Sequence, residues 1–424
     1  MKKSLVIVGA VVLACSATLG AEGTSNAAED AVTFSKDVAP ILYESCTECH
    51  RPGAIAPMSL LTYQDARPWA RAIKQKVASR EMPPWFADPT YQEYANDASL
   101  SQAEVDTIVA WVDAGAAKGE DADLPAMPEY TEGWSIGEPD MVFSLLEPFD
   151  VPADGTIPYL YFTVPTNLTE DKWIRAVEVK PSDRRVVHHV ITNLLRPDPN
   201  EPPSPKPALP GNRTRRLGGG VGGLVPNRLG HVYPPGYARR IPAGAEIQLQ
   251  MHYTTIGEPT QDQTSIGVIF TDGNEPPEKV FGGGLLSNSR FVIPPGAPSH
   301  EVRASMTFEE ETYMARFMPH MHVRGKDVTY TVTYPDGREE ILLHIPRYDF
   351  NWQLRYDLKE PKLLPAGTKM EVIAHFDNSE SNRFNPDPAQ EVRYGDQTWE
   401  EMMNGFYTTV RDFEPEPTTE NQQQ

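Results

Sequence analysis

The chain has 424 residues, which is enough for about three domains at roughly 150 residues per domain. Acidic residues number 59 and basic residues 38, and the resulting net charge of −21 argues against nucleic acid or an anionic membrane surface as a partner. The 41 prolines and 30 glycines are many for a helical protein, so the composition favours an all-β body with many turns.

Residues 1–21 predict an export signal. Two lysines precede an apolar run over residues 5–14, which is too short to span a bilayer permanently. The run ends in Val-Leu-Ala-Cys15, which resembles a bacterial lipobox with Cys15 as the lipidated residue; the alternative is simple cleavage near Gly20 or Ala21. We therefore expect a periplasmic protein or an outer-membrane-anchored lipoprotein, with membrane contact only through a lipid on Cys15.

The next motif carries redox chemistry. Once Cys15 is set aside, the remaining cysteines both lie in Cys46-Thr47-Glu48-Cys49-His50. CxxCH is the attachment motif of c-type haem, in which two thiols one turn apart form thioethers and the histidine becomes an axial iron ligand. A CxxC redox pair would need a βαβ context, and a zinc site would need two further ligands nearby. The motif therefore predicts covalent haem c.

The surroundings predict a small helical cytochrome c domain over residues 30–120. Helices are expected at 35–45, 65–77 and 101–114, and the last has a capping box from Ser101 and Glu104 and a closing Gly115.

We expect Met82 to be the sixth iron ligand, because a whole predicted helix separates it from His50 and prolines follow it. Met58 is the rival candidate for this iron ligand. The alternative for Met58 is that its side chain simply packs in the core of the domain. A Pro- and Gly-rich acidic linker is predicted over 121–140.

After the linker the hydrophobic period changes from 3.6 to 2. Residues 246–253 alternate cleanly and place His252 on the polar face of a strand. A Pro-Ala-Gly turn leads into this strand, and the same spacing recurs from Pro365 to His375. We therefore predict a multidomain fold in which the all-α cytochrome c domain precedes two all-β, jelly-roll-like antiparallel sandwiches. Their predicted bounds are 140–280 and 285–415, followed by a disordered tail at 416–424.

Histidines of this region suggest metal. His320 and His322 are two residues apart, so a strand would place both imidazoles on one face. His188 and His189 are adjacent and normally point to opposite faces, which argues weakly against a shared ion. From the residues alone, each histidine, His252 included, can equally be an ordinary hydrogen-bonding residue.

Four motifs in sequence order carry a family resemblance: His188-His189, Gln250-Met251-His252-Tyr253, His320-x-His322 and Glu400-Glu401-Met402. Residues 140–413 resemble the type II copper, ascorbate-dependent monooxygenases, which include peptidylglycine α-hydroxylating and dopamine β-monooxygenases. The resemblance implies two sandwiches with one copper each, facing across a solvent cleft. It assigns the electron-transfer copper to His188, His189 and His252, and the copper that binds O₂ to His320, His322 and Met402.

The chain also departs from this family. The animal enzymes have several disulfides, whereas the predicted body has no cysteine. Met318 stands where the peptide-hydroxylating members have a carboxylate-binding arginine, and Phe406 where they have a tyrosine, although Asn404 matches. These departures leave the substrate undefined. The family has no ligand at His375.

Together these patterns predict an O₂-dependent monooxygenase that hydroxylates a C–H bond of a small organic substrate. Electrons would pass from haem c to the two copper sites, and an external redox protein or ascorbate-like reductant would supply them. The alternatives are a non-catalytic electron-transfer or copper-binding protein, and a structural sandwich whose histidines bind no copper.

Overall fold

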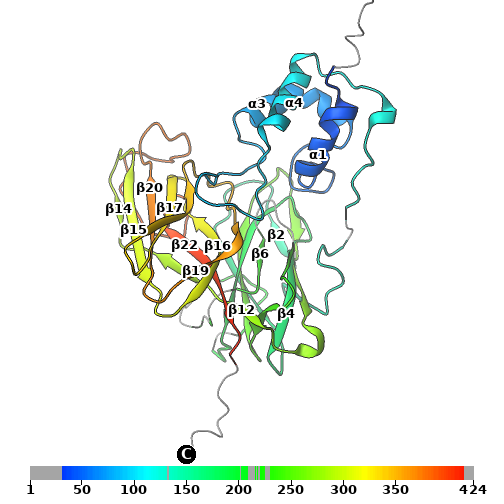
Figure 1. Cartoon of the computed structure of the whole chain (residues 1–424). Helices are drawn as coiled ribbons and strands as arrows, with labels where there is room; N and C mark the ends of the chain where they lie inside the picture. The colour runs from blue at the N-terminus through cyan, green and yellow to red at the C-terminus, as the bar shows by residue number, and fades with distance from the viewer. Residues whose placement is uncertain are drawn as a thin grey trace, which may run out of the picture.

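The computed structural model describes residues 31–130, 133–200, 202–208, 215, 217, 220–224 and 230–414. The predicted signal peptide and the predicted tail lie outside this part of the chain. A small helical unit (blue and cyan in Figure 1) sits above two β-sandwiches (green, and yellow to red). The chain is thus mostly β-sheet with few helices, as predicted.

The helical unit is built from four α-helices and three short turns of other helix types. Its elements are η1 (Phe34–Val38), α1 (Ala39–Ser45), α2 (Tyr63–Ala66), η2 (Arg67–Trp69), α3 (Ala70–Ala78), α4 (Gln102–Asp113) and η3 (Asp121–Asp123). Ser101 and Glu104 form the predicted capping box at α4. Gly115 follows α4 with φ +97°, a conformation that suits glycine. The core includes Trp111, which is fully buried.

The first sandwich packs a four-stranded sheet against part of a larger one. The small sheet has the order β3-β9-β5-β6, and β1, β11, β4, β8 and β7 lie in the larger sheet. The strands are β1 (Met141–Ser144), β2 (Phe149–Val151), β3 (Leu160–Pro165), β4 (Lys172–Lys180), β5 (Val187–Leu195), β6 (Gly223–Leu224), β7 (Gly230–Val232), β8 (Tyr237–Ile241), β9 (Glu246–Tyr253), β10 (Thr260–Asp262) and β11 (Ser265–Phe270), followed by η5 (Asp272–Asn274). The core faces of β5 and β9 meet at Val190 and Met251, both fully buried.

The second sandwich repeats this plan. Its four-stranded sheet has the order β15-β20-β17-β18 and faces the larger-sheet strands β12, β13, β22, β16 and β19. The strands are β12 (Lys279–Phe281), β13 (Gly284–Ser287), β14 (Val292–Ile293), β15 (His300–Thr307), β16 (Thr312–His320), β17 (Gly325–Thr333), β18 (Glu339–Ile345), β19 (Tyr356–Leu364), β20 (Lys369–Phe376), β21 (Val392–Arg393) and β22 (Asn404–Asp412). β9 and β20, the strands that follow the two Pro-Ala-Gly turns, occupy equivalent second positions in the two small sheets.

The two sandwiches are joined more closely than the sequence predicts. β12 pairs in parallel with β8 of the first sandwich and antiparallel with β22 of the second. One ten-stranded sheet therefore runs through both units, with a separate four-stranded sheet on each.

A second link joins residues within the predicted cytochrome c domain, residues 30–120, to the second sandwich. Trp85 and Tyr94 belong to the segment assigned to the helical domain, yet both pack in the core of the second sandwich against Tyr356. The backbone N–H of Asp88 donates to the carbonyl of His344 at 2.8 Å. We call residues 83–98 the strap, because this segment ties the helical unit to the second sandwich.

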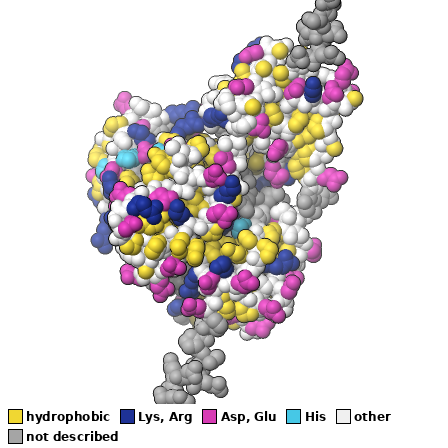
Figure 2. Space-filling model, viewed as in Figure 1, with side chains coloured by type: hydrophobic (Ala, Val, Ile, Leu, Met, Phe, Trp, Pro, Cys, Tyr) yellow, Lys and Arg dark blue, Asp and Glu magenta, His cyan; other side chains and the backbone are white. Residues whose placement is uncertain are grey.

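No helix of the described ranges is long and apolar enough to cross a membrane. Acidic side chains are scattered over the visible face of the molecule and interspersed with basic ones (Figure 2).

Candidate functional site

The CxxCH motif forms one turn at the end of α1. The backbone N–H groups of Cys49 and His50 donate to the carbonyl of Cys46, at 3.1 and 2.9 Å. Both cysteines carry thiols. This local geometry follows from the short sequence spacing and presents two sulfur atoms and one imidazole from a single turn.

The His50 ring is oriented by a backbone carbonyl. Its Nδ1 lies 3.3 Å from the Met58 carbonyl oxygen, which leaves Nε2 as the outward nitrogen. Burial lowers the pKa of His50, so the imidazole is neutral, the form that binds a metal. If Nε2 of His50 binds a metal, Met58 therefore lies on the same side of that metal as His50. Met82 lies where α3 leads into the strap, and its N–H donates to Lys76 at 3.2 Å.

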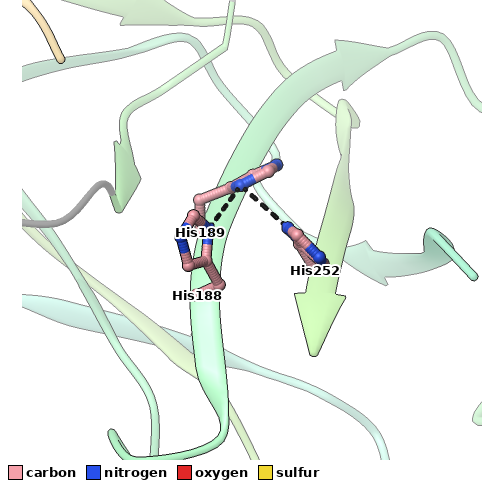
Figure 3. Close-up of side chains that lie close together, drawn as sticks. All are labelled: His188, His189 and His252. Carbon is pink, nitrogen blue, oxygen red and sulfur yellow. Dashed lines mark hydrogen bonds between the residues drawn. The ribbon is translucent and has the colours of Figure 1, made fainter. Parts of the chain in front are cut away.

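His188, His189 and His252 come together on the outer face of the first small sheet (Figure 3). One candidate ligand nitrogen from each histidine can be chosen so that all three lie within 4.8 Å of one another. The Nδ1 atom of His189 lies 3.2 Å from that of His188 and 3.4 Å from that of His252. We refer to these residues as the histidine triad.

A β-bulge brings the two adjacent histidines to one side. Val187 pairs with Tyr253, and His189 pairs with His252, so His188 is an extra residue in β5. Such an insertion breaks the alternation of side chains between faces. The expectation that adjacency argues against a shared site is therefore wrong, because the bulge turns His188 toward its neighbour.

His320, His322 and Met402 form a second group at the end of β16. The rings of His320 and His322 lie 5.1 Å apart, and His320 pairs with Asn404 across β16 and β22. Asn404 donates from Nδ2 to the sulfur of Met402 at 3.2 Å. We call these three residues the methionine group.

The Nδ1 atoms of this group are held by neighbours that the sequence did not reveal. His320 Nδ1 lies 2.7 Å from Gln353 Oε1, and His322 Nδ1 lies 3.2 Å from the Glu400 carbonyl. Each ring is thereby oriented with Nε2 outward, and the Nε2 of His322 is buried without a hydrogen-bond partner.

Glu401 belongs to the Glu400-Glu401-Met402 motif, but the sequence assigned no role to its side chain. Its buried carboxylate accepts the backbone N–H groups of His322 at 2.8 Å, Arg324 at 2.6 Å and Met402 at 3.2 Å. It therefore ties the two chain segments of the methionine group together. Burial raises its pKa to about 8. The only sequence feature that pointed to a role for Glu401 was its position next to Met402.

The triad and the methionine group are adjacent. The Tyr159 ring lies 4.9 Å from that of His252 and 6.2 Å from that of His322, and Phe350 also contacts both histidines. Tyr159 is 3% exposed, and its hydroxyl has no hydrogen-bond partner. The family resemblance implies a solvent cleft here; the structure places Tyr159 and Phe350 in contact with histidines of both groups.

Burial keeps these imidazoles neutral. Burial, with a smaller contribution from neighbouring histidines, lowers the pKa of His252 and His322 to about 3, and burial lowers that of His320 to about 4. Burial also lowers the pKa of His189, which is 1% exposed. Buried neutral nitrogens that converge are suited to hold a soft or borderline cation.

His375 lies apart from both groups. It faces Asp327, with Nδ1 2.6 Å from a carboxylate oxygen, and Glu301 at 3.6 Å from Nε2. Equivalent strand positions thus carry a triad histidine in β9 and a histidine beside two carboxylates in β20.

No family model and no curated protein matches the chain. Solved structures with similar folds include the STIV MCP (TM-score 0.29, 8% identity, 64% of this chain and 96% of that chain). Others are the major capsid protein P2 from bacteriophage PM2 (0.27, 9%, 65% and 98%) and allantoicase (0.17, 9%, 54% and 81%). Likenesses of this size carry no information about what the chain binds.

Proposed function

We propose that this chain is an exported oxidoreductase with one covalent haem c and two copper ions, and that it hydroxylates a C–H bond of a small organic substrate with O₂. The observation that carries the proposal is the gathering of all six expected copper ligands. They come from four distant segments of the chain and form two adjacent groups.

The donor sets fit copper. The triad offers three imidazoles, whereas the methionine group offers two imidazoles and a thioether. Imidazole suits copper, and thioether favours Cu(I). The unsatisfied Nε2 of His322, which is 0% exposed, would cost free energy without a partner, and a bound cation would provide one.

The CxxCH turn fits haem c. Both thiols and the neutral His50 are presented by one turn, and the Met58 carbonyl fixes the histidine with Nε2 outward. Because Met58 lies on that side, we propose that Met82 supplies the sixth ligand and that the helical unit is a cytochrome c domain.

The bound groups would supply one-electron chemistry for the use of O₂. The chain would receive electrons from an external redox protein or an ascorbate-like reductant, and pass them from the helical unit to the triad and then to the methionine group. Its own residues orient the ligands, keep them unprotonated and surround them with Tyr159 and Phe350.

A second candidate is a non-catalytic electron carrier. The burial of His189, His320 and His322 favours it, because electron transfer does not require substrate access.

Metal analysis and an oxygen-consumption screen separate these functions. We expect one iron and about two coppers per chain, with oxygen consumption stimulated by a small phenethyl or acyl-glycine compound. His320→Ala and Met402→Ala should each abolish that stimulation and leave the triad copper bound. His375→Gln is the matched control and should keep both coppers. Full metal loading without stimulation by any compound would favour the carrier, and a copper-free chain would contradict both.

A further inference from the structure

A cavity of about 300 Å³ lies between the CxxCH turn and the first sandwich. The helical unit lines one side of it, and the connection between β4 and β5 lines the other. The polar and sulfur-bearing residues around it are Glu48, Cys49, Arg51, Glu178, Lys180, Ser182 and Arg184. Cys49, the second cysteine of the motif, therefore faces the same cavity as Arg184, which lies four residues before His188 of the triad.

Arg184 is the residue of this segment that joins both sides. Its guanidinium donates a hydrogen bond to the Val187 carbonyl, and His188 is the next residue along the chain. Arg184 lines the same cavity as Cys49, and burial lowers its pKa to about 10. Arg184 thus lines the cavity together with Cys49 and is hydrogen-bonded to the first residue of β5.

Its neighbour Arg185 provides a contrast. Arg185 is exposed and forms ion pairs with Asp183 at 2.8 Å and Glu258 at 3.0 Å. The two adjacent arginines therefore differ in role: one neutralises surface carboxylates, and the other faces the haem-attachment turn.

We propose that Arg184 is a positioning residue for the haem edge at Cys49 and that it connects this edge to the triad through the Val187 carbonyl. The inference rests on the proposed function. The route carries one electron and no atoms: Fe(II) is oxidised to Fe(III), Cu(II) at the triad is reduced to Cu(I), and no bond or proton is exchanged. The guanidinium charge also disfavours the more positive Fe(III) form, so it raises the haem reduction potential.

The test uses the full-length, metal-loaded chain and two readouts that do not depend on turnover. Spectroelectrochemical titration gives the haem potential, and photoreduction followed by transient absorption gives the rate of electron transfer from haem to triad. Arg184→Gln should lower the potential and slow the transfer by about tenfold, equivalent to about 1.4 kcal/mol in the barrier. Arg184→Lys keeps the charge and should restore the potential, and Arg185→Gln should leave both values unchanged.

The outcomes separate this inference from the function on which it rests. If Arg184→Gln matches Arg185→Gln in both readouts while haem and copper are present, the connection through Arg184 is wrong and the proposed function stands. If Arg184→Gln fails to fold, Arg184→Lys still decides: an altered potential with the charge retained overturns the electrostatic role. A chain purified without covalent haem overturns the proposed function and this inference together.

Discussion

At the scale of single residues, small displacements decide which side chains can share a ligand. His188 joins the triad through one inserted residue in β5. Tyr159 stands beside His252 because it directly precedes β3, whose first residue, Leu160, pairs with Met251. The Met58 carbonyl oxygen contacts Nδ1 of His50, and the Gln353 amide oxygen contacts Nδ1 of His320. These contacts leave Nε2 of each ring as the outward nitrogen. The following three predictions depend on such single contacts.

The first concerns the sixth haem ligand. Met82→Ala should replace the thioether ligand of the iron and lower the haem potential, because a thioether favours Fe(II). Met58→Ala is the control, since the Met58 carbonyl already lies beside His50 Nδ1 and its backbone contact survives the substitution. Absorption near the thioether–iron band and a redox titration report both effects. A loss of the band in Met58→Ala alone would reverse the assignment.

The second concerns Glu401. Glu401→Gln replaces one of the two accepting oxygens with an NH2 group, which cannot accept, so the backbone N–H of Arg324 or those of His322 and Met402 lose their acceptor. We expect copper at the methionine group to bind about 10–100-fold more weakly, as for other residues that orient ligands. Glu400→Gln is the matched control because His322 contacts only the backbone carbonyl of Glu400. Competition titration with a copper chelator measures the affinities, and equal values in the two variants would contradict the role of Glu401.

The third concerns pH. The folded-state pKa values of His252, His320 and His322 lie at about 3 to 4, below the ordinary value of roughly 6.5. Below about pH 6.5 the unfolded chain therefore binds more protons than the folded chain, so the metal-free protein loses stability as the pH falls toward 4. Thermal unfolding between about pH 7.5 and pH 5 should show this loss, and His320→Gln should flatten it. A pH-independent Tm would be inconsistent with neutral buried imidazoles.

At the scale of elements, the strap packs differently from what its position in the sequence predicts. It lies between two helices of the helical unit, yet Trp85 and Tyr94 complete the core of the second sandwich. Tyr94 donates its hydroxyl to the Leu342 carbonyl at 3.0 Å, and Asn96 donates to Arg355 at 2.7 Å. The strap begins directly after Met82, so the same short segment joins the proposed iron ligand to the second sandwich.

Trp85→Ala tests this link. Trp85 is 8% exposed and packs against Tyr94 and Tyr356, so the substitution should lower the free energy of unfolding by about 3–5 kcal/mol. Trp69→Ala is the matched control, because Trp69 is 46% exposed and should change the value by only about 0.5 kcal/mol. The free energy of unfolding of both variants is measured by denaturant unfolding, which is followed separately by haem absorption and by circular dichroism. Equal effects would mean that the strap does not share the sandwich core.

At the scale of the whole molecule, one ten-stranded sheet and the strap hold three units around the two histidine groups. His188 Nε2 lies 2.9 Å from the carbonyl of Asn351 in the second sandwich, so the triad itself touches the partner unit. The methionine group lies on the other side of Tyr159. This arrangement places the triad where the two sandwiches meet.

The relay prediction belongs to this scale. When haem-reduced protein is mixed with O₂ and a hydroxylatable substrate, haem oxidation should be fast only if copper is present. His252→Ala should slow it sharply, because the substitution removes a triad ligand. Stopped-flow absorption follows the haem directly, and His375→Gln serves as the control. If copper-free protein oxidises its haem as quickly, the helical unit has a role other than electron supply.

The sequence by itself determined the features that are encoded locally. The helix at α4 follows from its capping box, the alternation of β9 from its period of two, and the single turn of CxxCH from its spacing. Residues far apart required the folded chain. The bulge at His188, the placement of Tyr159 and the three contacts of Glu401 depend on strand register and long-range packing, which no short sequence window encodes. The shared sheet and the strap were missed for the same reason, because β12 and Trp85 are stabilised by partners that are distant in the chain.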